Sequence, residues 1–235
     1  MFDPKQLLDQ FLGSSAGTGM RDIAGQAKQR LDQAGGTKSF AGGAALGGIL
    51  GMLLGGGRHS RGFGGGLLSH GGAAALGALA LRAYQNYQQQ QSVAATKPMT
   101  PVEVSQVAPQ LLPHHQPAAD GGPLELVLLR AMVGAAKSDG HVDAVEQQHL
   151  FAVVERMSLD AEAKAFIFDL LAKPVDLTDI SSKVTSEAQA GEVYPAARMA
   201  IDPDQPAERA YLDALASRMK LPAQLREHLD KQASG

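Results

Sequence analysis

Two short acidic stretches hold the residues of this sequence that are best suited to chemistry. The first contains Asp139, Asp143 and Glu146, and the second contains Asp202, Asp204 and Glu208. Hard divalent cations favour several carboxylate and carbonyl oxygens that converge from a turn and from the helix after it. Each stretch therefore predicts one half of a site for calcium, magnesium or manganese. The ligand spacing of an EF-hand loop is absent from both stretches.

Helix capping is a simpler interpretation of most of these acids. Asp143 followed three positions later by Glu146 is the pattern of a capping box, and Asp204 also precedes a predicted helix. Capping does not explain Asp139 or Asp202, because each is expected at the end of the preceding helix, where the helix dipole disfavours negative charge. Those two residues favour cation binding, and both interpretations stay open.

The chain from Pro123 onward has the apolar periodicity of α-helices. A first helix is predicted to begin at Pro123, and others are predicted at 143–157, 160–172, 177–184, 187–199, 206–219 and 222–232. Prolines punctuate these segments, and no segment alternates as a β-strand does. The predicted fold class is therefore all-α, a bundle of about seven helices.

An internal repeat divides this helical region. When the sequence is shifted by 62 residues, several identical residues align. The aligned pairs are Glu146 with Glu208, Leu150 with Leu212, Arg156 with Arg218, Met157 with Met219 and Leu159 with Leu221. The agreement predicts two similar helix pairs around a shared core, each preceded by one of the acidic stretches.

A glycine-rich apolar region precedes the helical region. Residues 40–57 carry no charge, and as a helix they would extend about 27 Å, close to the thickness of the hydrocarbon core of a bilayer. Small residues repeat at every fourth position here and again in 62–81, and this spacing allows close packing of membrane helices. These residues are Gly43, Gly47, Gly51, Gly55, Gly65, Ser69, Ala73 and Gly77. A membrane-inserted helical hairpin is predicted, with a flexible Gly/Ala linker as the alternative.

Composition suggests four regions with different roles. They are an amphipathic or flexible segment (1–38), the glycine-rich membrane region (39–82), a Pro/Gln-rich linker (83–122) and the helical domain (123–235). The absence of cysteine excludes disulfides and thiolate metal sites. The last region has eighteen acids against twelve lysines and arginines, which disfavours nucleic-acid binding. The basic residues flanking the two apolar segments favour a cytoplasmic location for both termini.

The stretches AAKSDGHVDAVEQQ and AIDPDQPAERAYLDALASRMKLP resemble the TerB-like domain of tellurite-resistance proteins. The layout, with a glycine-rich apolar region before that domain, is similar to the YebE family of bacterial inner-membrane proteins, also called the DUF533 family. The resemblance implies an all-α TerB-like bundle in the inner membrane and no established enzymatic activity. It also implies that the six acids named above bind a divalent cation. Pro203 departs from a plain acidic-glycine turn and weakens the second half of that site.

These features suggest three possible functions. The preferred one is a membrane-anchored, cation-binding interaction or adaptor protein that responds to stress or serves the cell envelope, with the bilayer and an unknown protein as partners. The alternative is a structural membrane protein that forms homo-oligomers through its glycine-faced helices, with the acidic stretches acting only as caps. An enzyme is disfavoured, because His141 has neither a nucleophile nor a phosphate-binding loop near it.

Overall fold

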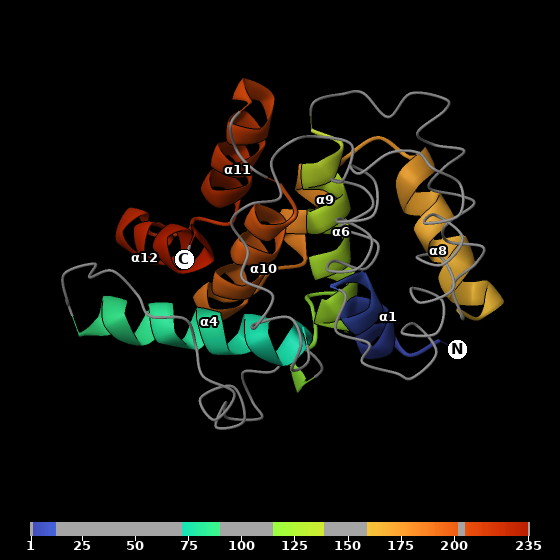
Figure 1. Cartoon of the computed structure of the whole chain (residues 1–235), viewed down its shortest axis with the longest axis horizontal. Helices are drawn as coiled ribbons and strands as arrows, with labels where there is room; N and C mark the ends of the chain where they lie inside the picture. Colours follow the sequence, from blue (N-terminus) through green and yellow to red (C-terminus); the bar gives the residue numbers. More distant parts are fainter. Residues whose placement is uncertain (1, 13–71, 90–114, 139–158, 202–204, 235) are drawn as a thin grey trace, which may run out of the picture.

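The computed structural model describes residues 2–12, 72–89, 115–138, 159–201 and 205–234. These residues form eight α-helices and no β-strand, which confirms the all-α prediction (Figure 1). The helices are α1 (Pro4–Phe11), α4 (Gly72–Gln88), α6 (Leu124–Ala136), α8 (Ala161–Ala172), α9 (Leu177–Ser182), α10 (Glu187–Met199), α11 (Pro206–Arg218) and α12 (Ala223–Ser234).

Helices α8 to α12 begin and end within two residues of their predicted bounds, because local signals set their ends. Asp160 caps α8 by accepting a hydrogen bond from the Ala163 amide at 2.8 Å. Ser186 caps α10 in the same way, accepting from the Gln189 amide at 3.2 Å. Such side-chain caps satisfy amides that have no partner inside the helix. The helix predicted at 143–157 lies outside the described residues.

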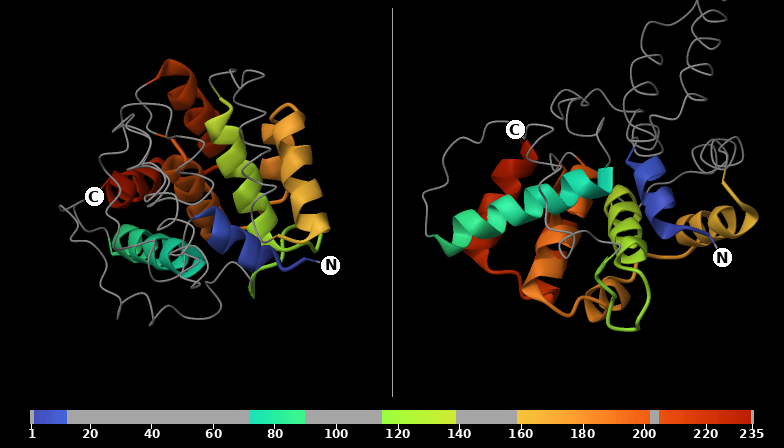
Figure 2. Two further views of the ribbon diagram at one scale, coloured as in Figure 1. Left: turned by 45° about the vertical axis from the view of Figure 1, so that its right-hand side comes forward. Right: turned by 90° about the horizontal axis from the view of Figure 1, so that it is seen from below.

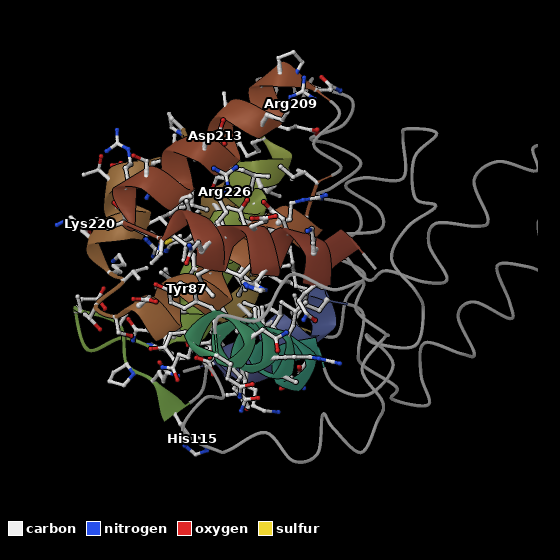
Figure 3. The ribbon with its side chains drawn as sticks, turned by 90° about the vertical axis from the view of Figure 1, so that its left-hand side faces the viewer. Tyr87, His115, Arg209, Asp213, Lys220 and Arg226 are labelled. Atoms are coloured by element: carbon white, nitrogen blue, oxygen red, sulfur yellow. The ribbon has the colours of Figure 1, made fainter. Side chains whose placement is uncertain are left out.

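Helix α10 lies at the centre of the fold. It packs against α4, α6, α11 and α12, and the residues from Gly191 to Ala197 are all buried. Tyr194 is among the largest fully buried side chains, and its hydroxyl donates to Asp230 of α12 at 2.8 Å and accepts from Arg226 at 2.9 Å. Arg226 also donates to Asp213 of α11, and Figure 3 shows these two side chains on neighbouring helices. Polar contacts thus join α11 and α12 around the apolar centre.

The N-terminal helix α1 is part of the same core. Four apolar side chains are at most 1% exposed: Leu7, Leu8 and Phe11 of α1, and Leu12 directly after it. They pack in one cluster with residues of α6 and α10, and α1 contacts both α6 and α4. An eight-residue helix is marginal in water by itself, so this burial is what stabilises it. The N-terminal segment is therefore joined to the helical region by tertiary packing.

Helix α4 crosses the predicted boundary between the glycine-rich region and the linker. It lies against α10 and α12, beneath both in Figure 1 and along the same side of the fold in Figure 2. Leu76 and Leu79 are buried there, while Tyr84 and Tyr87 pack at the edge of the core. Among the helices of the described residues, none is both long enough and apolar enough to cross a bilayer.

Candidate functional site

The acidic stretches follow α6 and α10, and these two helices begin side by side. Gln189 in the first turn of α10 donates to the Pro117 carbonyl at 2.8 Å, just before α6. Lys183, which precedes α10, pairs with Asp120 at 2.7 Å, and the Ala119 amide donates to the Lys183 carbonyl at 2.9 Å. Because α6 and α10 begin together and pack against each other, they run in the same general direction.

Both helices also stop at equivalent points. Each contains thirteen residues, and they end at Ala136 and Met199. In each case an aspartate follows three positions later in the sequence: Asp139 after α6 and Asp202 after α10. Both helices therefore lead toward an acidic stretch from the same end of the fold, while the first copy of the predicted repeat lies mostly outside the described residues.

Helix α11 reaches the C-terminal half of α6. The Tyr211 hydroxyl donates to the Ala131 carbonyl at 2.9 Å in a buried position. A Cβ atom on Gly134 would lie 2.5 Å from that hydroxyl oxygen and 2.9 Å from Cγ1 of Val175, so glycine permits this close approach. Glu208 lies in the first turn of α11 and is half-buried, three residues before Tyr211. The start of α11 therefore lies near the end of α6 from which the first acidic stretch departs.

Lys137 follows the last residue of α6 and fixes that end to α8. Its ammonium group donates to the carbonyls of Leu170, Leu171 and Lys173 at 3.2, 2.7 and 2.6 Å. Burial lowers the pKa of this ammonium group. Unpaired carbonyls at a helix C-terminus attract cations. Lys137 is the described basic residue closest in sequence to Asp139, and its ammonium group is bound by carbonyls at the end of α8.

Most of the predicted cation ligands fall in parts of the chain without described coordinates. Only Glu208 is placed, and the other five predicted ligands lie outside the described residues. These are Asp139, Asp143, Glu146, Asp202 and Asp204. Within the described ranges, no cluster of three or more His, Cys, Asp or Glu side chains is arranged to hold a metal ion. The cation site therefore stays a prediction.

The predicted helix-packing residues of the glycine-rich region are also mostly outside the described ranges. These are Gly43, Gly47, Gly51, Gly55, Gly65 and Ser69. Ala73 and Gly77 lie in α4, and Gly77 is buried. The neighbours of α4 among the described elements are α1, α10 and α12.

Two buried carboxyl groups were missed by sequence reasoning. Glu125 in the first turn of α6 and Glu192 in the middle of α10 are each 1% exposed. Burial raises the pKa of Glu192 to about 8, with repulsion from Glu125 adding to the effect, and burial also raises the pKa of Glu125. The only sequence signal was a single acid within each of two otherwise apolar stretches, LELVLL and AGEVYP.

Comparison with known proteins places this architecture in a family. Residues 39–233 match the family described as "Protein of unknown function (DUF533)". The chain belongs to the DUF533 family. This DUF533 protein is also similar to the "Uncharacterized protein in ampR 5'region" of Yersinia enterocolitica, with 27% identity over 104 residues, covering 44% of this chain and 75% of that protein. No solved structure shows a significant match to the DUF533 protein.

Proposed function

We propose that this DUF533 protein is a non-enzymatic, membrane-anchored module that binds a divalent cation between its two acidic stretches and serves as an interaction or adaptor protein. The observation that supports it most is the arrangement of α6 and α10. Two helices of equal length begin together, and each is followed at the third position by an aspartate. Acidic stretches that leave from one end of the fold can supply oxygen ligands to a shared ion.

The finer family assignment is part of this proposal. The acidic sequence patterns resemble TerB-like domains, and the layout resembles the YebE-like inner-membrane proteins. We assign the anchor to the glycine-rich region between α1 and α4, of which residues 40–57 carry no charge. Because α1 and α4 pack in one core, the chain between them must enter and leave the bilayer on the same side, as a helical hairpin does. The proposed location is the bacterial inner membrane, with the helical region in the cytoplasm.

One observation also supports the alternative, in which the acids only stabilise helix ends. Glu208 lies in the first turn of α11, Pro206 is the first residue of that helix, and Gln205 makes no side-chain cap. A carboxylate at this position stabilises the helix through its dipole without any ion. Under this alternative, the glycine-faced segments would carry the function by forming homo-oligomers.

Thermal unfolding of the full chain in detergent distinguishes the two. The full chain is required because the apolar residues of α1 and α4 are part of the core and a shorter fragment would expose their binding face. After removal of metals by a chelator, we expect calcium, magnesium or manganese to raise the unfolding temperature, because a ligand that binds only the native state stabilises it. The double variant Asp139→Asn with Asp202→Asn should lose that rise.

Asp169→Asn is the matched control, because Asp169 is an exposed acid of α8 that pairs only with the nearby Lys173 among the contacts described. It should keep the full response to the ion. A rise that persists in the double variant would place the ion elsewhere and refute the assignment. If no ion changes the wild-type unfolding temperature, the capping alternative stands, and replacing Gly47 and Gly51 with leucine should then abolish self-association in detergent.

A further inference from the structure

Glu125 and Glu192 are buried without enough hydrogen-bond partners. One carboxyl oxygen of each, Oε2 in both cases, has no hydrogen-bond partner among the described residues. The side-chain amide of Gln116 donates to the other oxygen of Glu192 at 3.5 Å, a long contact. A buried charge that lacks partners is costly, and two buried carboxylates that repel each other are costlier still.

The N-terminal helices pack on the two helices that carry these groups. Helix α1 packs on α6 and brings Asp3, Lys5 and Asp9 close enough to act on the pKa of Glu125. Helix α4 packs on α10, and α1 and α4 contact each other. We call α1 and α4 together the N-terminal cover. Residues 13–71 separate the two helices in the sequence and residues 90–114 separate α4 from the rest, so neither helix is joined to α6 or α10 by a short connection.

We propose that the N-terminal cover is a proton-dependent switch, which binds the α6–α10 face while Glu192 is protonated and leaves it when Glu125 and Glu192 are both ionised. Release would return both carboxylates to water and free the apolar face of α1. The switch requires no divalent cation, so it is independent of the cation site proposed above.

The position of each group decides which one holds the proton. Glu125 lies in the first turn of α6, where the helix dipole favours a negative charge. Glu192 lies in the sixth position of α10, where no such help exists, and its pKa of about 8 keeps it protonated at neutral pH. Since an exposed glutamate has a pKa near 4.3, release of the cover is coupled to loss of this proton.

The other charged groups around the pair do not remove the cost of ionisation. Asp3, which precedes α1, and Asp9 of α1 raise the pKa of Glu125, and Lys5 of α1 lowers it. Helix α4 contributes a single charged residue, the half-buried Arg82. On α12, Arg226 and Asp230 bind Tyr194, and His228 is a further buried titratable residue.

Charged residues of α8, α9 and α11 interact with groups other than Glu125 and Glu192. On α9, Asp179 pairs with Arg130 of α6 at 2.7 Å. From α8, Glu162 accepts from the Phe2 amide at 3.1 Å at an exposed position. Asp213 of α11 pairs with Arg226. Besides burial, the charges that act on the pKa of Glu125 are Asp3, Lys5 and Asp9, and the charge that acts on the pKa of Glu192 is Glu125.

Hydrogen exchange of the full chain between pH 5.5 and 9 tests the switch, with rates corrected for the intrinsic pH dependence of exchange. In the wild type, protection of residues 4–12 and 76–88 should fall by up to about tenfold per pH unit until pH 8 and then level off. Protection of α11 should fall less. Glu192→Gln keeps the shape of a protonated glutamate, so both cover helices should stay protected at all pH values. Glu187→Gln, an exposed change on the same helix, should behave as the wild type.

If Glu192→Gln does not fold, a distance measurement in a chain that keeps Glu192 tests the switch. The sequence has no cysteine, so Gln6→Cys on α1 and Ala165→Cys on α8 give a unique pair of sites for spin labels, both exposed. The distance between the labels should be single and short at pH 5.5, with a longer population growing toward pH 9. A distance that does not change with pH would overturn the proposal, as would equal pH dependence of α1 protection in the wild type and Glu192→Gln.

Discussion

The contact between Gly134 of α6 and Tyr211 of α11 leads to a quantitative prediction for Gly134→Ala. The new Cβ atom would lie 2.5 Å from the Tyr211 hydroxyl oxygen and 2.9 Å from Cγ1 of Val175, distances that packed atoms do not adopt. Overpacking of this kind costs about 1–3 kcal/mol, whereas alanine in place of glycine within a helix gains about 0.5–1 kcal/mol. The net expectation is a loss of about 1 kcal/mol in the free energy of unfolding.

Gly191→Ala is a matched control on the neighbouring helix. Gly191 is also buried within a helix, but a Cβ atom there would meet no atom within 4 Å, neighbouring helix backbone aside. This variant should gain the helix-propensity benefit without the clash and become more stable by about 0.5–1 kcal/mol. The two identical substitutions are therefore expected to have opposite signs.

Urea unfolding of the full chain, followed by circular dichroism, measures both variants. The midpoint should fall for Gly134→Ala and rise for Gly191→Ala, with similar slopes, because neither change alters the surface exposed on unfolding. Tyr211→Phe in the Gly134→Ala background should recover part of the loss, since it removes the closest atom. If Gly134→Ala proves as stable as the wild type, the close packing of α11 on α6 described above is wrong.

The same urea assay tests three further predictions. Lys137→Met should cost about 1–2 kcal/mol, because three carbonyls at the end of α8 lose a charged donor, while Lys231→Met, which removes only the exposed pair with Glu227 on α12, should cost little. Asp160→Ala should cost about 1 kcal/mol through loss of the α8 cap, and an unchanged midpoint would contradict it. Stability should fall as pH rises from about 4.5 to 8, by up to about 1.4 kcal/mol per unit, because folded Glu192 keeps a proton that the unfolded chain releases, and Glu192→Gln should flatten this slope.

The helices after residue 159 were predictable from sequence because their boundaries depend on nearby residues. Asp160 and Ser186 accept hydrogen bonds from amides three positions away, and Pro206 fixes the backbone at the first residue of α11. The first predicted helix and the one predicted at 187–199 correspond to α6 and α10. The cation ligands were proposed from the same local patterns, and of these only Glu208 lies in the described part of the chain.

Tertiary structure alone decided where the N-terminal apolar helices belong. A row of apolar residues indicates that one face must leave water, but it does not state whether lipid or protein will cover that face. Leu8 of α1 and Leu76 of α4 are buried by packing within this chain. Sequence therefore determined the helices after residue 159 to within two residues at their ends, and the three-dimensional packing determined which faces meet, because that choice depends on residues far apart in the chain.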